Sequence, residues 1–201
     1  KWIGGRKEIE DLDLFQFKIE KLQKQYPGKI IAGGYLEPRS IYSSNSYDKI
    51  GNFGNESRTV HLGLDFWLSP GTKVNSMFDG EVVISINDKG DKEYGGLLII
   101  KHKVENFEFY TLYGHNTVGS VLKNKIGAKI KKGDIIAEIA NYPENGNWAP
   151  HLHFQIMLNI YWRVLFVALD QDYQKDIRKL HQLHVLGIFL FFLQKLFLCL
   201  H

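Results

Sequence analysis

Two short segments of the chain combine histidine and aspartate at spacings that suit a metal ion. In the first, residues 60–66 alternate apolar and polar side chains, so His61 and Asp65 share one face of an extended chain. A straight strand would hold their backbones about 13 Å apart, whereas bonds from zinc to its ligands are only about 2 Å long. If both bind one ion, the chain must bend, and Gly63 permits a bend. Alternatively, His61 lies in the incoming loop and only Asp65 begins the strand.

The second segment, residues 148–156, places His151, His153 and Gln155 on one face of a predicted strand and apolar residues on the other. Packing explains the apolar face but not two adjacent imidazoles within a sheet. Neighbouring positions on one face are about 6.6 Å apart, which suits one histidine that binds a metal and another that reaches a water at that metal. His115 ends a further apolar run at a predicted strand-to-turn junction, where functional sites commonly lie.

The remaining histidines carry no such pattern. We interpret all four as structural or surface residues: His102, His181, His184 and His201. Of these, His102 ends an apolar strand and is the one that could support the site. Each metal motif is weak evidence by itself, so the interpretation depends on all of them occurring together.

The site segments lie in a part of the chain with a strong β pattern. Between residues 60 and 157, short runs rich in β-branched residues alternate with turns that contain glycine. We therefore predict a mainly β fold, an antiparallel β-sandwich or barrel-sandwich-like sheet. The predicted strands are 81–86, 97–101, 107–113, 129–130 and 135–139.

Three further segments surround this predicted domain at 60–157. Residues 1–30 predict an N-terminal helix that Tyr26-Pro27-Gly28 ends, and residues 31–59 predict a long loop that flanks the site. Residues 158–201 form an apolar tail, predicted to be helical. A buried helix, an interfacial helix or a non-native reading frame would each explain that tail.

Composition excludes several classes of protein. The 201 residues are 44% hydrophobic and 23% charged, as in ordinary globular proteins. The basic residues are scattered and the net charge is only +3, so no nucleic-acid partner is expected. The longest apolar run, 185–193, is far shorter than the roughly 20 residues of a membrane span. The single cysteine, Cys199, allows no disulfide within the chain.

As an ordered set, the motifs resemble the LytM/lysostaphin-type zinc endopeptidases. The resemblance covers about residues 58–157, and 70–74, 79–82 and 126–134 also look like strands and turns of that family. It implies that one zinc ion is bound by three residues and that two further histidines are catalytic. The motifs are His61-x-x-x-Asp65, Tyr113-Gly114-His115 and His151-Leu152-His153-Phe154; the implied zinc ligands are His61, Asp65 and His153, and the implied catalytic residues are His115 and His151.

The resemblance also implies a substrate. Such enzymes hydrolyse Gly- or D-Ala-containing peptides of bacterial peptidoglycan by means of a metal-activated water, which implies the cell envelope. Residues 33–58 and 144–148 look, in addition, like the peptidase module of fused proteins with phosphotransferase-like and aminotransferase parts. That second resemblance implies a cytoplasmic protein with other enzyme domains as partners, so the compartment stays open.

Two other functions compete with the peptidase. One is a catalytically inert LytM-like binding or regulatory module, which the complete set of five site residues argues against. The other is a biotinyl or lipoyl carrier domain. Residues 127–139 have the pattern of glycine and β-branched residues that is typical of such domains. A carrier needs an exposed hairpin lysine flanked by methionine, which we do not find, and has no use for His-x-His.

Overall fold

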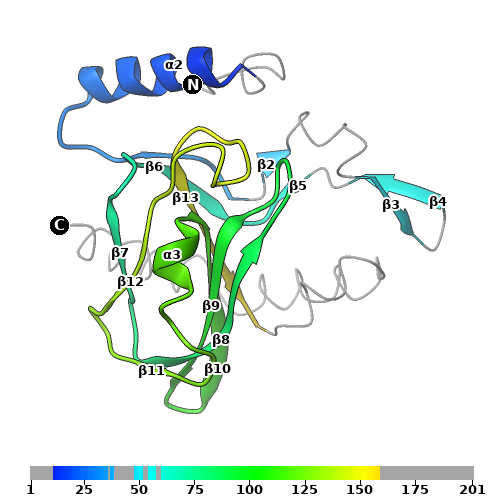
Figure 1. Ribbon diagram of the computed structural model, residues 1–201, viewed down its shortest axis with the longest axis vertical. Helices are drawn as coiled ribbons and strands as arrows, with labels where there is room; N and C mark the ends of the chain where they lie inside the picture. Colours follow the sequence, from blue (N-terminus) through cyan, green and yellow to red (C-terminus); the bar gives the residue numbers. More distant parts are fainter. Residues whose placement is uncertain (1–10, 36, 39–47, 52–53, 58–59, 159–201) are drawn as a thin grey trace.

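The computed structural model describes residues 11–35, 37–38, 48–51, 54–57 and 60–158. A seven-stranded antiparallel sheet forms its centre, with the strand order β1-β6-β13-β10-β9-β8-β11 (Figure 1). Three two-stranded sheets, β12-β7, β2-β5 and β3-β4, accompany it. The predicted mainly β, antiparallel fold with an N-terminal helix is therefore confirmed. The elements are α2 (Leu12–Gln25), β1 (Ile31–Ala32), β2 (Glu37–Pro38), β3 (Asp48–Gly51), β4 (Gly54–Ser57), β5 (Val60–His61), β6 (Leu64–Trp67), β7 (Lys73–Asn75), β8 (Gly80–Asp88), β9 (Gly95–Val104), β10 (Phe107–Asn116), α3 (Val118–Val121), β11 (Lys129–Ile130), β12 (Ile135–Glu138) and β13 (His151–Met157).

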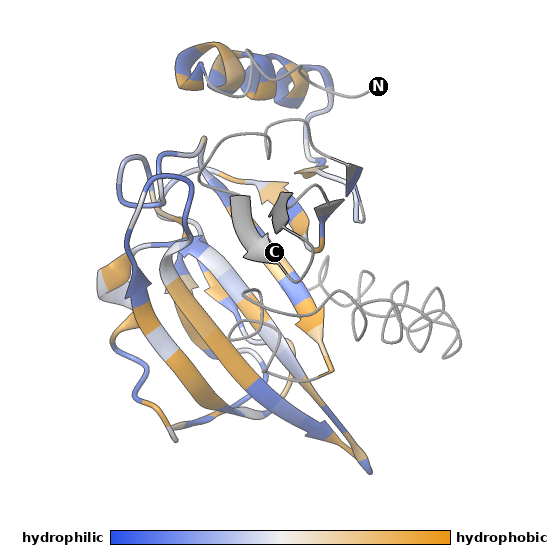
Figure 2. Cartoon of the chain, turned by 90° about the vertical axis from the view of Figure 1, so that its right-hand side faces the viewer, coloured by the Kyte–Doolittle hydropathy of each residue, from blue (hydrophilic) through white to orange (hydrophobic). Residues whose placement is uncertain are grey.

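The central strands are apolar on both faces. In β9, Leu98 and Ile100 belong to the main core, whereas Leu97 and Ile99 pack in a second cluster on the opposite face. All four are fully buried, which explains why this strand reads as a continuous apolar run and not as an alternating one. Figure 2 shows hydrophobic stretches as orange bands along the long strands of the sheet.

Strand β13 contributes one face to the same core. Leu152 and Phe154 are buried in the main cluster with residues of β8, β9 and β12, as the alternation of residues 148–156 predicts. The intervening residues of β13 therefore point to the other side of the strand, where the polar site is built. Packing of the apolar face thus fixes the direction of the histidines.

The segment predicted as a long loop differs from that prediction, because the described parts of residues 31–59 contain four short strands. β1 extends the central sheet by pairing with β6, with Ile31 opposite Trp67. Strands of two to four residues are too short to produce a periodic pattern, so sequence reasoning missed them. The predicted helical tail lies outside the described residues, except for residue 158.

Helix α2, which lies within the predicted N-terminal helix, lies across one end of the sheet (Figure 1). It begins after Asp11, whose side chain accepts a hydrogen bond from the Leu14 amide at 3.0 Å, and it ends at Tyr26 as predicted. Its buried residues Phe15 and Ile19 pack with Trp67 of β6. Within the described residues, no helix is both long and apolar enough to cross a bilayer.

Candidate metal centre

The chain bends between the two residues of the first motif, as their geometry requires. β5 ends at His61, β6 begins at Leu64, and the break at residues 62–63 turns both side chains toward the same point. Gly63 is needed here for a close approach, because a Cβ at this position would lie 2.6 Å from Cε1 and Nε2 of His153. Antiparallel pairing of β6 with β13 places Asp65 directly opposite His153.

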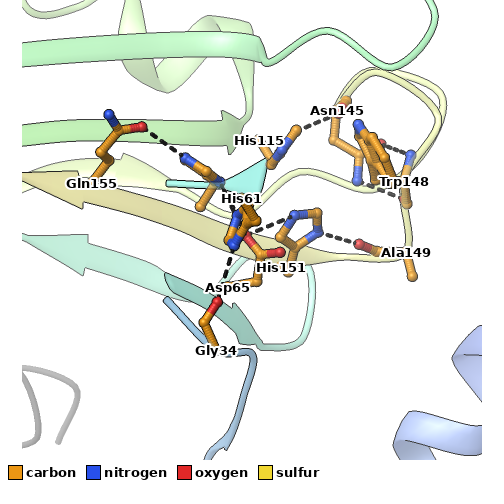
Figure 3. Close-up of polar contacts among 10 residues, drawn as sticks. Gly34, His61, Asp65, His115, Asn145, Trp148, Ala149, His151 and Gln155 are labelled. Atoms are coloured by element: carbon orange, nitrogen blue, oxygen red, sulfur yellow. Dashed lines mark hydrogen bonds and ion pairs between the residues drawn. The ribbon is translucent and has the colours of Figure 1, made fainter. Parts of the chain in front are cut away.

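The potential ligand atoms of these three residues form a compact triangle. Figure 3 labels two of the three, His61 and Asp65, among the other residues of the site. His61 Nε2 lies 2.9 Å from His153 Nδ1 and 3.1 Å from Asp65 Oδ1, and the third side, from His153 Nδ1 to Asp65 Oδ1, is 3.1 Å. Ligand atoms about 2 Å from one tetrahedral ion lie about 3.3 Å from each other. All three residues are at least 95% buried, with 3%, 1% and 5% exposure for His61, Asp65 and His153.

The outer contacts of the two imidazoles decide which nitrogens face the triangle. His61 Nδ1 lies 3.3 Å from the Gly34 carbonyl oxygen, and His153 Nε2 lies 3.5 Å from Gln155 Oε1. Because those oxygens only accept, a proton on each outer nitrogen would pair with them and would leave a lone pair on each inner nitrogen. In that tautomer, two imidazole lone pairs and a carboxylate oxygen would face each other. A buried group of this kind favours a bound cation, and the N, N, O donor set suits zinc.

The other two predicted site histidines lie beside this triangle. His151 begins β13, its Nδ1 donates to the Ala149 carbonyl at 2.6 Å, and its Nε2 lies 3.6 Å from Asp65 Oδ1. His115 lies at the irregular end of β10 with a positive φ of 65°, and its Nδ1 donates to the Asn145 carbonyl at 2.8 Å. The two rings are 4.3 Å apart. The structure therefore brings all five predicted site residues together.

Electrostatics keep His115 neutral in this arrangement. Burial holds the pKa of His115 well below its usual range, and the neighbouring His151 and His153 lower the pKa further. Its Nδ1 carries the single proton, so Nε2 presents a lone pair.

Aromatic residues that sequence reasoning did not single out enclose the site. The Tyr94 ring lies 5.1 Å from the His153 ring and 5.4 Å from the His115 ring. Trp148 contacts His115 and His151 edge to face at 6.0 and 6.2 Å. The buried side chain of Asn145 clamps the Trp148 backbone, accepting from its amide at 3.1 Å and donating to its carbonyl at 2.8 Å. The only sequence signals for these residues were their positions beside turns or the second motif.

His102 has a structural role, as predicted. It is 1% exposed, its Nδ1 donates to the Asp79 carbonyl at 2.9 Å, and its Nε2 lies 2.6 Å from Thr111 Oγ1. With both nitrogens engaged and its ring packed between Phe78 and Phe109, it takes no part in the site. His181, His184 and His201 lie outside the described residues.

Comparison with known proteins decides the family. The model of peptidase family M23 matches residues 59–162, slightly more than half of the chain, and this segment holds the complete cluster. The chain belongs to peptidase family M23. Its membership confirms the resemblance drawn from the motifs.

Two staphylococcal proteins are similar to this M23 domain. Glycyl-glycine endopeptidase ALE-1 of Staphylococcus capitis is 33% identical over 99 residues, which is 49% of this chain and 25% of that protein. Lysostaphin of Staphylococcus staphylolyticus is 30% identical over 103 residues, 50% of this chain and 19% of that protein. The matched segment thus spans a quarter or less of each relative.

Among solved structures, LytU matches with 25% identity and a TM-score of 0.47, over 67% of this chain and 79% of that chain. The catalytic domain of lysostaphin from Staphylococcus simulans matches with 25% identity and a TM-score of 0.43, over 67% of this chain and 85% of that chain.

Proposed function

We propose that this chain is a zinc-dependent endopeptidase in which His61, Asp65 and His153 hold one zinc ion. The observation that carries the proposal is the buried triangle of three potential ligand atoms, 2.9 to 3.1 Å apart, from two histidines and an aspartate. Three protein ligands leave a coordination position open, as in catalytic zinc sites. A bound zinc ion would polarise a peptide carbonyl and make water a usable nucleophile at neutral pH.

His151 is the proposed general base. The Ala149 carbonyl fixes the proton on Nδ1, so the lone pair of Nε2 points toward the triangle, 3.6 Å from Asp65 Oδ1. A water that enters beside the triangle can pass its proton to Nε2, and the imidazolium formed can give that proton to the leaving amine. The stacked Trp67 ring, at 6.0 Å, excludes bulk water from one face of the imidazole.

His115 is the second proposed catalytic residue, and its tautomer narrows its role. Either stabilisation of the oxyanion or orientation of the attacking water fits its position in the family motif. A neutral imidazole whose Nδ1 donates to Asn145 has only a lone pair at Nε2, and a lone pair cannot donate to an oxyanion. We therefore assign His115 to the orientation of water through Nε2.

The proposed substrates are Gly- or D-Ala-containing peptides of the cell-wall type, and the proposed place of action is the bacterial cell envelope. Support comes from membership of family M23 and from the name of one relative, a glycyl-glycine endopeptidase. Fusion to other enzyme domains, the alternative that the second resemblance raised, would place the same chemistry in another compartment.

One experiment tests zinc binding and peptidase activity together. Protein purified without chelators is analysed for metal and is incubated with pentaglycine and with muropeptides that contain D-Ala. About one zinc per chain and cleavage of at least one peptide are expected. One zinc without any cleavage would favour the inert module, and protein without zinc would show that a proton, not a metal, joins the triangle.

A further inference from the structure

Helix α2 lies outside the segment that matches the M23 family, yet it packs directly behind the site. The family match begins at residue 59, and α2 spans Leu12–Gln25. Phe15 and Ile19, each 6% exposed, form a cluster with Ala149 of the site loop, to which Trp67 and Ile31 add their side chains. A helix that merely linked domains would not need to bury residues against that loop.

The contacts run from the helix to the proposed base in two steps. The Phe15 ring lies 5.8 Å from the Trp67 ring at an interplanar angle of 58°. The Trp67 ring in turn stacks on the His151 imidazole at 6.0 Å and 30°. Strand pairing places Trp67 and His151 opposite each other, so the backbone cannot separate the two rings. Phe15 therefore packs against the same indole ring on which the His151 imidazole stacks.

The same helix also supports the other contact of His151. The Ala149 carbonyl, which fixes the proton of His151 on Nδ1, belongs to a residue that is 3% exposed and packed in the cluster with Phe15. On the same loop, the Tyr142 hydroxyl donates to Asp13 Oδ1 of the helix at 3.4 Å. Both residues that restrain the imidazole, Trp67 by stacking and Ala149 by hydrogen bonding, thus pack in one cluster with residues of α2.

We propose that Phe15 and Trp67 are positioning residues for His151, and that α2 is a working part of the active site although it lies outside the family match. This inference rests on the proposed role of His151 as the base. Without the Phe15 ring, the indole can tilt toward the helix and the imidazole loses its stacking partner. A general base acts only in narrow geometry, and a misplacement of about 1 Å costs on the order of 10²-fold in rate. A partial loss of support is expected to lower kcat about tenfold.

The test compares Phe15→Ala and Phe15→Leu with Phe17→Ala in the full chain. Phe17 is on the same helix but is 61% exposed, so its replacement controls for loss of a phenylalanine from α2. Both Phe15 variants are expected to lower kcat, the alanine variant more, with KM changed less than twofold and one zinc retained. The nuclear Overhauser effect between the Trp67 indole and the His151 imidazole should weaken in both, whereas Phe17→Ala should match the wild type in every measurement.

The leucine variant keeps the proposal testable if the alanine variant does not fold. Wild-type kcat and an unchanged Trp67–His151 Overhauser effect in Phe15→Leu would overturn the proposal, even if the melting temperature falls. The spectroscopic measurement needs no substrate. A wild-type protein that cleaves none of the peptides would therefore refute the peptidase, while the Overhauser effect would still decide whether α2 positions His151.

Discussion

Replacing Gly63 by alanine tests whether the triangle is a metal site held in place by close packing. The added Cβ would lie 2.6 Å from two ring atoms of His153 and 2.8 Å from the Phe154 carbonyl oxygen, on the strand that pairs with β6. Ordinary contact begins at 3.4 Å, so the imidazole would have to move by about 0.8 Å. Movement of the ring relieves only the contact with His153, so the backbone of β6 or β13 must also shift to relieve the contact with the Phe154 carbonyl oxygen.

That displacement is large compared with what a zinc site tolerates. Ligand distances in a zinc site vary by about 0.2 Å, so a shift of about 0.8 Å removes His153 from the coordination sphere or strains the strand. We expect zinc affinity to fall at least 10–100-fold, the range seen when the support of a ligand is lost. Overpacking should also lower the free energy of unfolding by about 1–3 kcal/mol.

The assay is zinc competition with a chromophoric chelator, combined with urea unfolding of the zinc-free protein. Gly119→Ala is the matched control, because Gly119 lies in α3 and a Cβ there would meet no atom within 4 Å. This control should bind zinc like the wild type and be as stable or slightly more stable. Wild-type zinc affinity in Gly63→Ala would refute the assignment of His153 as a ligand that packs against residue 63.

Three further predictions concern the site and its support. Metal analysis should show loss of zinc in Asp65→Ala and in His153→Ala. In contrast, His151→Ala should keep zinc while its rate of hydrolysis falls about 10²–10⁴-fold. Release of zinc by His151→Ala would exchange the roles assigned to His151 and His153. Asn145→Ala removes two hydrogen bonds to the Trp148 backbone, so urea unfolding should show a loss of about 1–3 kcal/mol, and unchanged stability would show that the clamp is dispensable. Burial lowers the pKa of His102, so the folded state favours its neutral form. The contribution of neutral His102 to stability is therefore present above the unfolded pKa of about 6.5, and it is lost as the pH falls below that value. The urea midpoint should therefore fall less between pH 7.5 and pH 5.5 in His102→Gln than in the wild type, and equal slopes would contradict this.

Residue type and order were sufficient to predict which five side chains the structure brings together, whereas their roles stay predictions. His61 and Asp65 alternate with apolar residues, and the alternation in β13 correctly directs Leu152 into the core and His153 away from it. The prediction that Gly63 permits a bend was incomplete. A bend does occur beside it, but the structure shows that the missing side chain makes room for an imidazole that is distant in sequence and adjacent only through strand pairing.

The supporting aromatic residues could not be predicted, because nothing local marks them. Phe15 is one apolar position on an amphipathic helix, and the pattern says that it is buried without saying what buries it. Trp67 follows Asp65 on the first motif's strand and looks like an ordinary apolar residue of that strand. Its position behind His151 depends on the pairing of β6 with β13, which no periodicity specifies.

The acceptors that fix the imidazole tautomers are still less visible in a sequence. The nitrogens of His61, His115 and His151 that face away from the centre lie near carbonyl oxygens of Gly34, Asn145 and Ala149. Every residue has such a carbonyl, so no residue type marks these positions, and an alanine scan would leave each acceptor in place. Only the course of the backbone turns the three lone pairs inward. The histidines supply the chemistry of the site, but the chemistry that each can perform, as a ligand or as a proton acceptor, is selected by main-chain atoms.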